Sequence, residues 1–204
     1  MSVLVVVDIQ NDFLHHGSLE VPQGNSIISI INALQPHFSN IVYTKDWHPA
    51  DHKSFAINHP NKKVGDIIPL QGVDQYLWPA HCVQNTHGSE LNNELIVRDE
   101  ARIIYKGTDR EIDSYSAFFD NLQAKATGLT EYIRSLKENK VYICGLAADY
   151  CVKFSVLDAI QEGFDTYVIA DATKAVNVNP GDYDLSLESM RIAGATIITS
   201  KQIL

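Results

Sequence analysis

The chain has 204 residues, 45% of them apolar, which is enough to bury one substantial α/β core. Its 16 Lys and Arg against 25 Asp and Glu give a net charge of −9, which argues against nucleic acid or an anionic membrane surface as the main partner. No run reaches the length of a membrane span, and the apolar start meets Asp8 too early for a signal peptide. The three cysteines form no CxxC pair, which favours the reducing cytoplasm.

Short apolar runs alternate with helical patterns along the chain. The spacing of apolar residues predicts helices near residues 27–34, 129–136, 151–160 and 185–193. The apolar runs predict strands over residues 3–7, 41–43, 102–105, 141–144, 167–169 and 196–198. This order predicts an α/β fold of three layers, α-β-α, with a central, mostly parallel sheet of about six strands.

One segment, from about residue 45 to 100, interrupts this alternation. It has no clean periodicity, yet it contains both tryptophans and several prolines and histidines. Irregular segments of this length inside a compact domain are usually functional or disordered, and the apolar residues argue against disorder. We therefore expect one domain over residues 1–204, with this segment as an insertion that carries part of the function.

Reactive side chains follow four of the predicted strands. Asp8, Asp46 and Lys106 end three strands, and Cys151 comes shortly after a fourth. Ligands of open parallel sheets bind beyond the carboxyl ends of the strands, so these groups are expected to meet there. Taken singly, each has an ordinary alternative: a turn residue, a solvent-facing lysine, or an inert core thiol such as Cys144.

Together, the acid, the lysine and the thiol suit nucleophilic catalysis. A lysine and a helix N-terminus stabilise a thiolate, so we expect the pKa of Cys151 to be lowered. A neighbouring carboxylate can take the thiol proton and return it to a leaving group. Asp8, Lys106 and Cys151 therefore form a candidate site for amide hydrolysis through a thioester.

A second polar group lies in the insertion. Asp46 and His48 are two residues apart, so in an extended stretch they point the same way. His52 and His81 follow along the chain. A carboxylate with two or three imidazoles suits zinc, iron or manganese with coordination places left open. The alternatives are a solvated histidine-rich loop and a structural zinc clip.

Six segments together carry a resemblance to a known family. They are VDIQNDF (7–13), KDWHPADHKSFAINH (45–59), LWPAHCVQNTHGS (77–89), YKGTD (105–109), DSYSAFFDN (113–121) and GLAADYCVKFSVLDA (145–159). In this order they resemble the nicotinamidases, isochorismatase-like cysteine hydrolases that also deamidate pyrazinamide. The likeness runs from residue 3 to about 195. The first segment is shared with metal-free relatives, whereas DWHP, WPxHC, KG and DYCV are highly specific when they occur together.

The resemblance implies catalytic roles for these residues. Cys151 is then the nucleophile, Asp8 the general base and later acid, and Lys106 the cation that lowers the thiol pKa. The backbone N–H groups of Ala147 and Cys151 form the oxyanion hole, and a cis peptide bond precedes Ala147. Phe13, Trp78 and Tyr115 line the pocket for an aromatic ring, although each could equally be a core residue.

The same resemblance implies one divalent metal ion, zinc before iron or manganese. Asp46, His48 and His81 hold it. His52 ranks second as a ligand, because the third histidine of some relatives stands at a different spacing.

The implied function is metal-dependent hydrolysis of nicotinamide to nicotinic acid and ammonia in NAD salvage, with pyrazinamide as a further substrate. The nearest rival is a metal-independent hydrolase of another small amide or a vinyl ether, and the intact metal donors argue against it. A non-catalytic nucleotide-binding module is disfavoured, because no glycine-rich phosphate loop follows the first strand. Neither a nucleic acid nor a membrane partner is expected, and the oligomeric state stays open, a homo-oligomer included.

Overall fold

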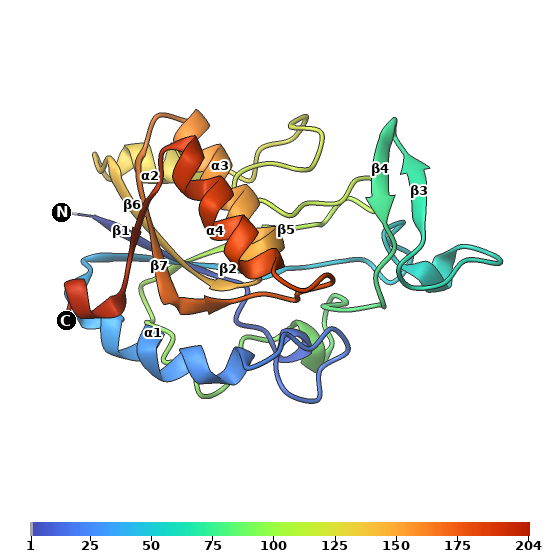
Figure 1. Ribbon diagram of the computed structural model, residues 1–204, viewed down its shortest axis with the longest axis horizontal. Coiled ribbons are helices and arrows are strands. Elements are labelled where there is room, and N and C mark those ends of the chain that lie inside the picture. The colour runs from blue at the N-terminus through green and yellow to red at the C-terminus, as the bar shows by residue number, and fades with distance from the viewer. Residues whose placement is uncertain (1) are drawn as a thin grey trace.

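The computed structural model describes residues 2–204 and has one parallel sheet at its centre (Figure 1). The six strands lie in the order β5-β2-β1-β6-β7-β8, and every neighbouring pair is parallel. Their bounds are β1 Val3–Val7, β2 Asn40–Asp46, β5 Arg102–Lys106, β6 Lys140–Leu146, β7 Asp165–Lys174 and β8 Thr196–Ile198. The predicted sheet is confirmed.

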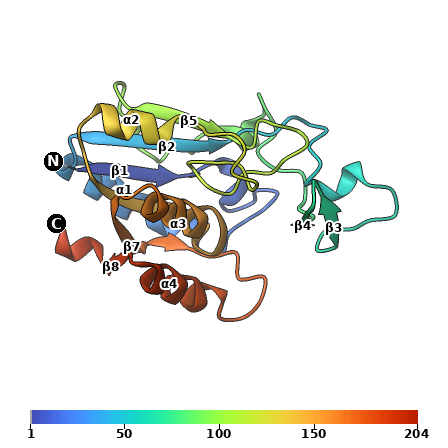
Figure 2. The same cartoon turned by 90° about the horizontal axis from the view of Figure 1, so that it is seen from above.

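Helices cover both faces of the sheet. Helix α1 (Ile28–Leu34) lies on one face, and α2 (Leu129–Ser135), α3 (Lys153–Gln161) and α4 (Asp182–Ala193) lie on the other (Figures 1 and 2). Strand β1 shows why both faces need cover: Leu4 and Val6 pack in the cluster with α1, whereas Val3, Val5 and Val7 pack in the opposite cluster. A strand buried on both faces is apolar at every position, and the predicted three layers are confirmed.

The insertion contains a hairpin that the sequence analysis missed. Strands β3 (Ile67–Leu70) and β4 (Val73–Tyr76) pair antiparallel and lie away from the main sheet (Figures 1 and 2). The two turn residues between them, Gln71 and Gly72, both have positive φ, the geometry of a tight hairpin turn. Short strands with an exposed apolar residue, such as Ile67 at 61% exposure, do not show the alternation that marks a strand.

The carboxyl ends of β1, β2, β5 and β6 meet at one edge of the sheet, next to the insertion. The chain leaves β6 through a cis peptide bond between Leu146 and Ala147, as the family resemblance implied. Among the described residues, no helix has the length and apolar character needed to cross a membrane.

Candidate active site

Asp8, Lys106 and Cys151 lie together at this sheet edge. Lys106 Nζ is 2.9 Å from Asp8 Oδ2 and 3.4 Å from Cys151 Sγ. The thiol and the Asp8 carboxylate have atoms within 4.8 Å of each other, and all three residues are buried. Asp8 follows β1, Lys106 ends β5, and Cys151 follows β6, so the strand ends bring the three groups together as the sequence predicted.

Thr44 on β2 fixes the orientation of the Asp8 carboxylate. Its hydroxyl donates to Asp8 Oδ1 at 2.5 Å and accepts the Asp8 N–H at 3.1 Å. The other oxygen, Oδ2, is thereby left facing Lys106. The sequence analysis missed Thr44, because it lies inside a strand and no motif distinguishes it from other strand threonines.

Burial decides the protonation of the nucleophile. It raises the pKa of Cys151 well above the usual thiol range, Asp8 and Asp46 act in the same direction, and Lys106 lowers it. The expected effect of Lys106 is present, but the expected net lowering of the thiol pKa is wrong. Burial also raises the pKa of Asp8, against the attraction of Lys106. The resting thiol therefore keeps its proton, and Asp8 is a base of raised pKa beside it.

Cys151 lies in a wide helical turn that joins β6 to α3. The turn covers Ala148–Val152 and has π-helical hydrogen bonding, with the Val152 N–H donating to the Ala147 carbonyl at 3.0 Å. Ser155 Oγ donates to the Cys151 carbonyl at 2.6 Å and so links this turn to the first turn of α3. The thiol thus stands at the N-terminal end of α3, where the helix dipole stabilises negative charge.

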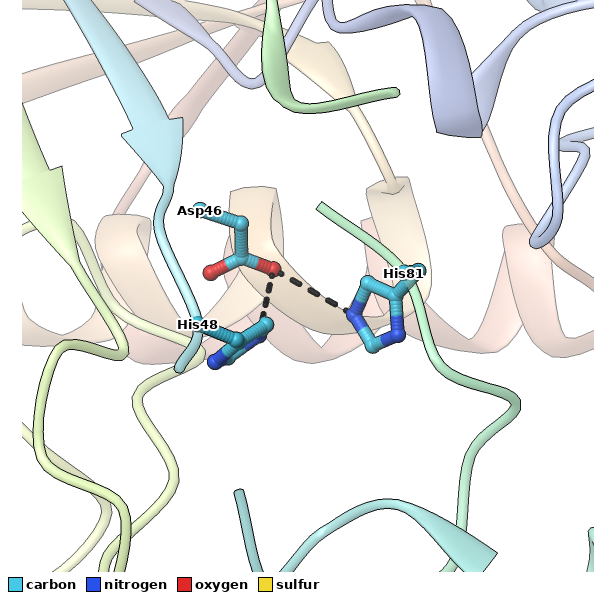
Figure 3. A group of neighbouring side chains, drawn as sticks. All are labelled: Asp46, His48 and His81. Atoms are coloured by element: carbon cyan, nitrogen blue, oxygen red, sulfur yellow. Dashed lines mark ion pairs between the residues drawn. The ribbon is translucent and has the colours of Figure 1, made fainter. Parts of the chain in front are cut away.

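Asp46, His48 and His81 form a compact donor set (Figure 3). Asp46 Oδ2 lies 3.3 Å from His48 Nε2 and 3.6 Å from His81 Nε2. All three are buried, and one donor atom from each lies within 4.8 Å of the other two. Within the described part of the chain, His48 Nε2 has no hydrogen-bond partner. One carboxylate and two imidazoles fit a divalent metal ion with open coordination places.

The second nitrogen of each histidine supports this assignment. His48 Nδ1 lies 2.9 Å from the Gly107 carbonyl, and His81 Nδ1 lies 2.8 Å from the Pro79 carbonyl. A carbonyl oxygen only accepts, so each Nδ1 carries a proton, and in the neutral ring Nε2 then presents its lone pair towards Asp46. Metal-bound histidines are held in this way by their outer partners.

His52 has the opposite arrangement. Its Nδ1 accepts the Ser54 N–H at 3.2 Å, so the neutral ring carries its proton on Nε2 and has no lone pair there. Burial, with His48 as the next cause, lowers the pKa of His52 to about 4, which keeps the ring neutral. The His52 ring packs against the His48 ring at 4.3 Å between centroids. These contacts favour a supporting role for His52 and not direct ligation.

A pocket joins the thiol to the metal donors. The three predicted aromatic residues, Phe13, Trp78 and Tyr115, line it together with Cys151. The remaining lining residues are Leu19, Asp46, His81, Asp113, Ala147, Tyr150 and Val176. Of these, the sequence analysis missed Leu19, Asp113, Tyr150 and Val176; Tyr150 could have been found from its place beside Cys151.

Gln10 is a further residue that the sequence analysis missed. Its Nε2 donates to the Asp46 carbonyl at 2.7 Å, and its Oε1 accepts the Asp46 N–H at 2.7 Å. The same Nε2 donates to the Ser89 carbonyl at 3.0 Å. Gln10 therefore fixes the backbone of the metal-binding carboxylate. The available signal was an amide side chain three residues after the first strand, inside the segment VDIQNDF.

A buried thiol with a carboxylate and a lysine, beside a carboxylate–imidazole donor set on a parallel α/β sheet, defines a cysteine hydrolase with an adjoining site for a divalent metal. The chain belongs to the isochorismatase family, because the Isochorismatase domain model matches residues 2–202.

Three relatives are informative. The Escherichia coli nicotinamidase is 42% identical over 202 residues, which cover 96% of this chain and 93% of that protein. The nicotinamidase/pyrazinamidase structure from Acinetobacter baumannii is 43% identical, has a TM-score of 0.96, and is matched over 100% of this chain and 98% of that one. The pyrazinamidase of Pyrococcus horikoshii in complex with zinc is 35% identical, with a TM-score of 0.80 and coverage of 97% and 98%.

Proposed function

We propose that this chain is a nicotinamidase, which hydrolyses the carboxamide of nicotinamide to nicotinic acid and ammonia. The observation that carries this function is that Cys151 lines one aromatic pocket together with the metal donors Asp46 and His81. A ring bound there has its carboxamide beside the thiol. Nicotinamidases from two bacteria, 42% and 43% identical over nearly the whole chain, support the assignment.

The first half-reaction forms a thioester. Asp8 takes the proton of the Cys151 thiol, and the sulfur attacks the carboxamide carbon. The backbone N–H groups of Ala147 and Cys151 stabilise the resulting oxyanion; one such donor contributes about 2.7–4 kcal/mol in other enzymes. Asp8 then gives its proton to the leaving nitrogen, the C–N bond breaks, and ammonia departs.

The second half-reaction uses water. Asp8, again a carboxylate, takes a proton from a water molecule that attacks the thioester carbon. The C–S bond breaks, nicotinic acid leaves, and the sulfur recovers its proton. Lys106 contacts both the Asp8 carboxylate and the Cys151 sulfur. It therefore offsets the negative charge whether that charge is on the carboxylate or on the sulfur.

Phe13, Trp78 and Tyr115 hold the pyridine ring during both steps. One divalent metal ion is held by Asp46, His48 and His81, whereas His52 supports His48. When bound, the ion supplies a Lewis-acidic centre that orients the ring. Zinc is the preferred ion, because it suits this donor set and because the Pyrococcus horikoshii relative was solved with zinc.

Pyrazinamide, which differs by one ring nitrogen, is a second substrate, in keeping with relatives named as pyrazinamidases. The described residues, 2–204, form a single domain, in which the insertion over about 45–100 supplies the metal donors. The three free cysteines are buried and suit a reducing compartment, so the enzyme works in the cytoplasm.

The direct test is turnover by the purified protein. Nicotinamide is supplied to protein reconstituted with zinc, and ammonia and nicotinic acid are both quantified. Equal amounts of the two products are expected, and a chelator should stop their formation. The function is wrong if the zinc-loaded protein releases neither product.

A further inference from the structure

A buried carboxylate beside the nucleophile holds one wall of the pocket. Asp149 lies two residues before Cys151 and is 7% exposed. Its Oδ1 accepts the Val176 N–H at 3.0 Å, and its Oδ2 accepts the Asn177 N–H at 2.9 Å. One carboxylate thus binds two successive peptide groups, and the catalytic steps above make no use of it.

These two peptide groups belong to the segment that links β7 to α4, residues 175–181. The segment is also fixed to α4: the Asn179 N–H donates to Asp182 Oδ2 at 2.8 Å, and the Tyr183 N–H donates to the side-chain Oδ1 of Asn177 at 3.0 Å. Its near end is fixed by Asp149. Val176, at this near end, lines the pocket together with Cys151.

We propose that Asp149 is a positioning residue that determines which rings the pocket accepts, because it holds Val176 as a fixed wall next to the nucleophile. This inference rests on the proposed function for the identity of the substrate. A carboxylate suits the task, since it accepts on both oxygens and charge-assisted hydrogen bonds are roughly twice as strong as neutral ones. With the wall released, nicotinamide binds more weakly and rings that carry an extra substituent are excluded less.

The first test compares Asp149→Asn and Val176→Ala with a matched control. An asparagine presents an NH₂ group to one of the two N–H donors, so one hydrogen bond is lost. Asp171→Asn is the control, because Asp171 also accepts two hydrogen bonds across the chain, from Ser200 N at 2.7 Å and Ser200 Oγ at 2.5 Å, and does not line this pocket.

Asp149→Asn should raise KM for nicotinamide about tenfold and lower kcat much less, the scale of one lost charge-assisted hydrogen bond. The ratio of kcat/KM for 5-methylnicotinamide to that for nicotinamide should rise in Asp149→Asn and in Val176→Ala. The double variant should show little further rise, because both changes remove the same wall. Asp171→Asn should leave KM and the ratio as in the wild type.

A second readout does not need nicotinamide turnover. Cys151 is alkylated with iodoacetamide and with the bulkier N-ethylmaleimide, and Asp149→Asn should raise the relative rate of the bulkier reagent. If the wild type fails to hydrolyse nicotinamide, the proposed function is wrong and this reagent ratio still tests the wall. The inference is overturned if Asp149→Asn leaves the reagent ratio unchanged, or if Asp171→Asn changes it equally.

Discussion

Lys106 Nζ lies 2.6 Å from Asp46 Oδ1, an ion pair that joins the thiol half of the site to the metal half. The other Asp46 oxygen faces the two imidazole nitrogens. Burial alone would lower the pKa of Lys106, but Asp46 and Asp8 together raise it well above the usual range. The lysine therefore stays charged, and one cation contacts the carboxylate of the thiol half and the carboxylate of the metal half.

Cys151→Ala should abolish nicotinamide hydrolysis while the fold persists. The side chain lines the pocket, so losing one sulfur leaves little unfilled core. Removal of a covalent nucleophile should lower the rate by at least about 1,000-fold, measured as ammonia release.

Cys144→Ala is the matched control, because Cys144 is equally free and buried but lies on β6, with its sulfur 3.9 Å from the Val5 carbonyl. Its variant should keep the activity, although the lost packing lowers stability. Substantial ammonia release by Cys151→Ala would falsify the covalent mechanism.

The sequence predicted the site well where the fold alone decides position. In a parallel sheet the strand ends meet at one edge, so Asp8, Lys106 and Cys151 could be placed together from strand order. The shift of the Cys151 pKa was predicted in the wrong direction. Burial of the thiol depends on the packed structure, and its effect on the pKa outweighs that of Lys106. Thr44 was missed for a related reason, since its contact with Asp8 spans 36 residues.

The place of Val176 in the pocket wall also depends on contacts between residues that are far apart in the sequence. No pattern in residues 175–181 indicates that this segment returns to the pocket, where two hydrogen bonds to Asp149 hold its near end. The hairpin β3–β4 was missed because its turn residues, Gln71 and Gly72, do not form one of the common hairpin dipeptides.

Lys106→Met should shift alkylation of Cys151 to higher pH. Only the thiolate reacts, so below the pKa of the thiol the rate rises about tenfold per pH unit. Lys106 lowers this pKa, and its loss should therefore slow iodoacetamide at neutral pH. A pH profile identical to the wild type would contradict this role.

The same variant should be less stable. Without Lys106, two carboxylates stay buried without their cation, and breaking a buried ion pair costs about 3–5 kcal/mol. Urea unfolding measures this loss, and the alkylation profile is read only where the variant remains folded. Lys106→Arg is the companion variant, since it keeps the charge in an altered shape.

Asp46→Ala, His48→Ala and His81→Ala should each lose bound metal and turnover together. Each change removes one donor of a three-residue set. Cys151 should still be alkylated by iodoacetamide, because in this scheme the ion orients the ring and does not activate the sulfur. Metal content per chain and alkylation rate are measured on the same sample. Stoichiometric metal in His81→Ala would contradict the donor set.

His52→Gln should keep stoichiometric metal at saturation. Its neutral ring carries its proton on Nε2, so the variant loses a neighbour of His48 and not a donor. Loss of such an outer contact lowers affinity by about 10–100-fold. His59→Gln is the control, because His59 is a partly buried histidine that donates to the Lys53 carbonyl at 2.7 Å. This variant should leave the affinity for the metal unchanged. If His52→Gln binds no metal, His52 is a ligand.

Gly107→Ala should remove the metal without touching a donor. Gly107 has φ 64°, and a Cβ atom there would stand 2.7 Å from His48 Nδ1 and 3.3 Å from Asp46 Oδ1. The His48 ring must then move away from the Gly107 carbonyl that fixes its proton. Gly163→Ala separates this clash from backbone strain, because Gly163 has φ 83° and no atom within 4 Å of an added Cβ. Gly163→Ala should lose about 1–2 kcal/mol of stability from the left-handed backbone, measured by urea unfolding, and Gly107→Ala should lose more because of the added clash with His48. Only Gly107→Ala should lose metal and nicotinamide turnover. Equal metal content in the two variants would show that the close packing of Gly107 against the His48 ring does not hold His48 in place.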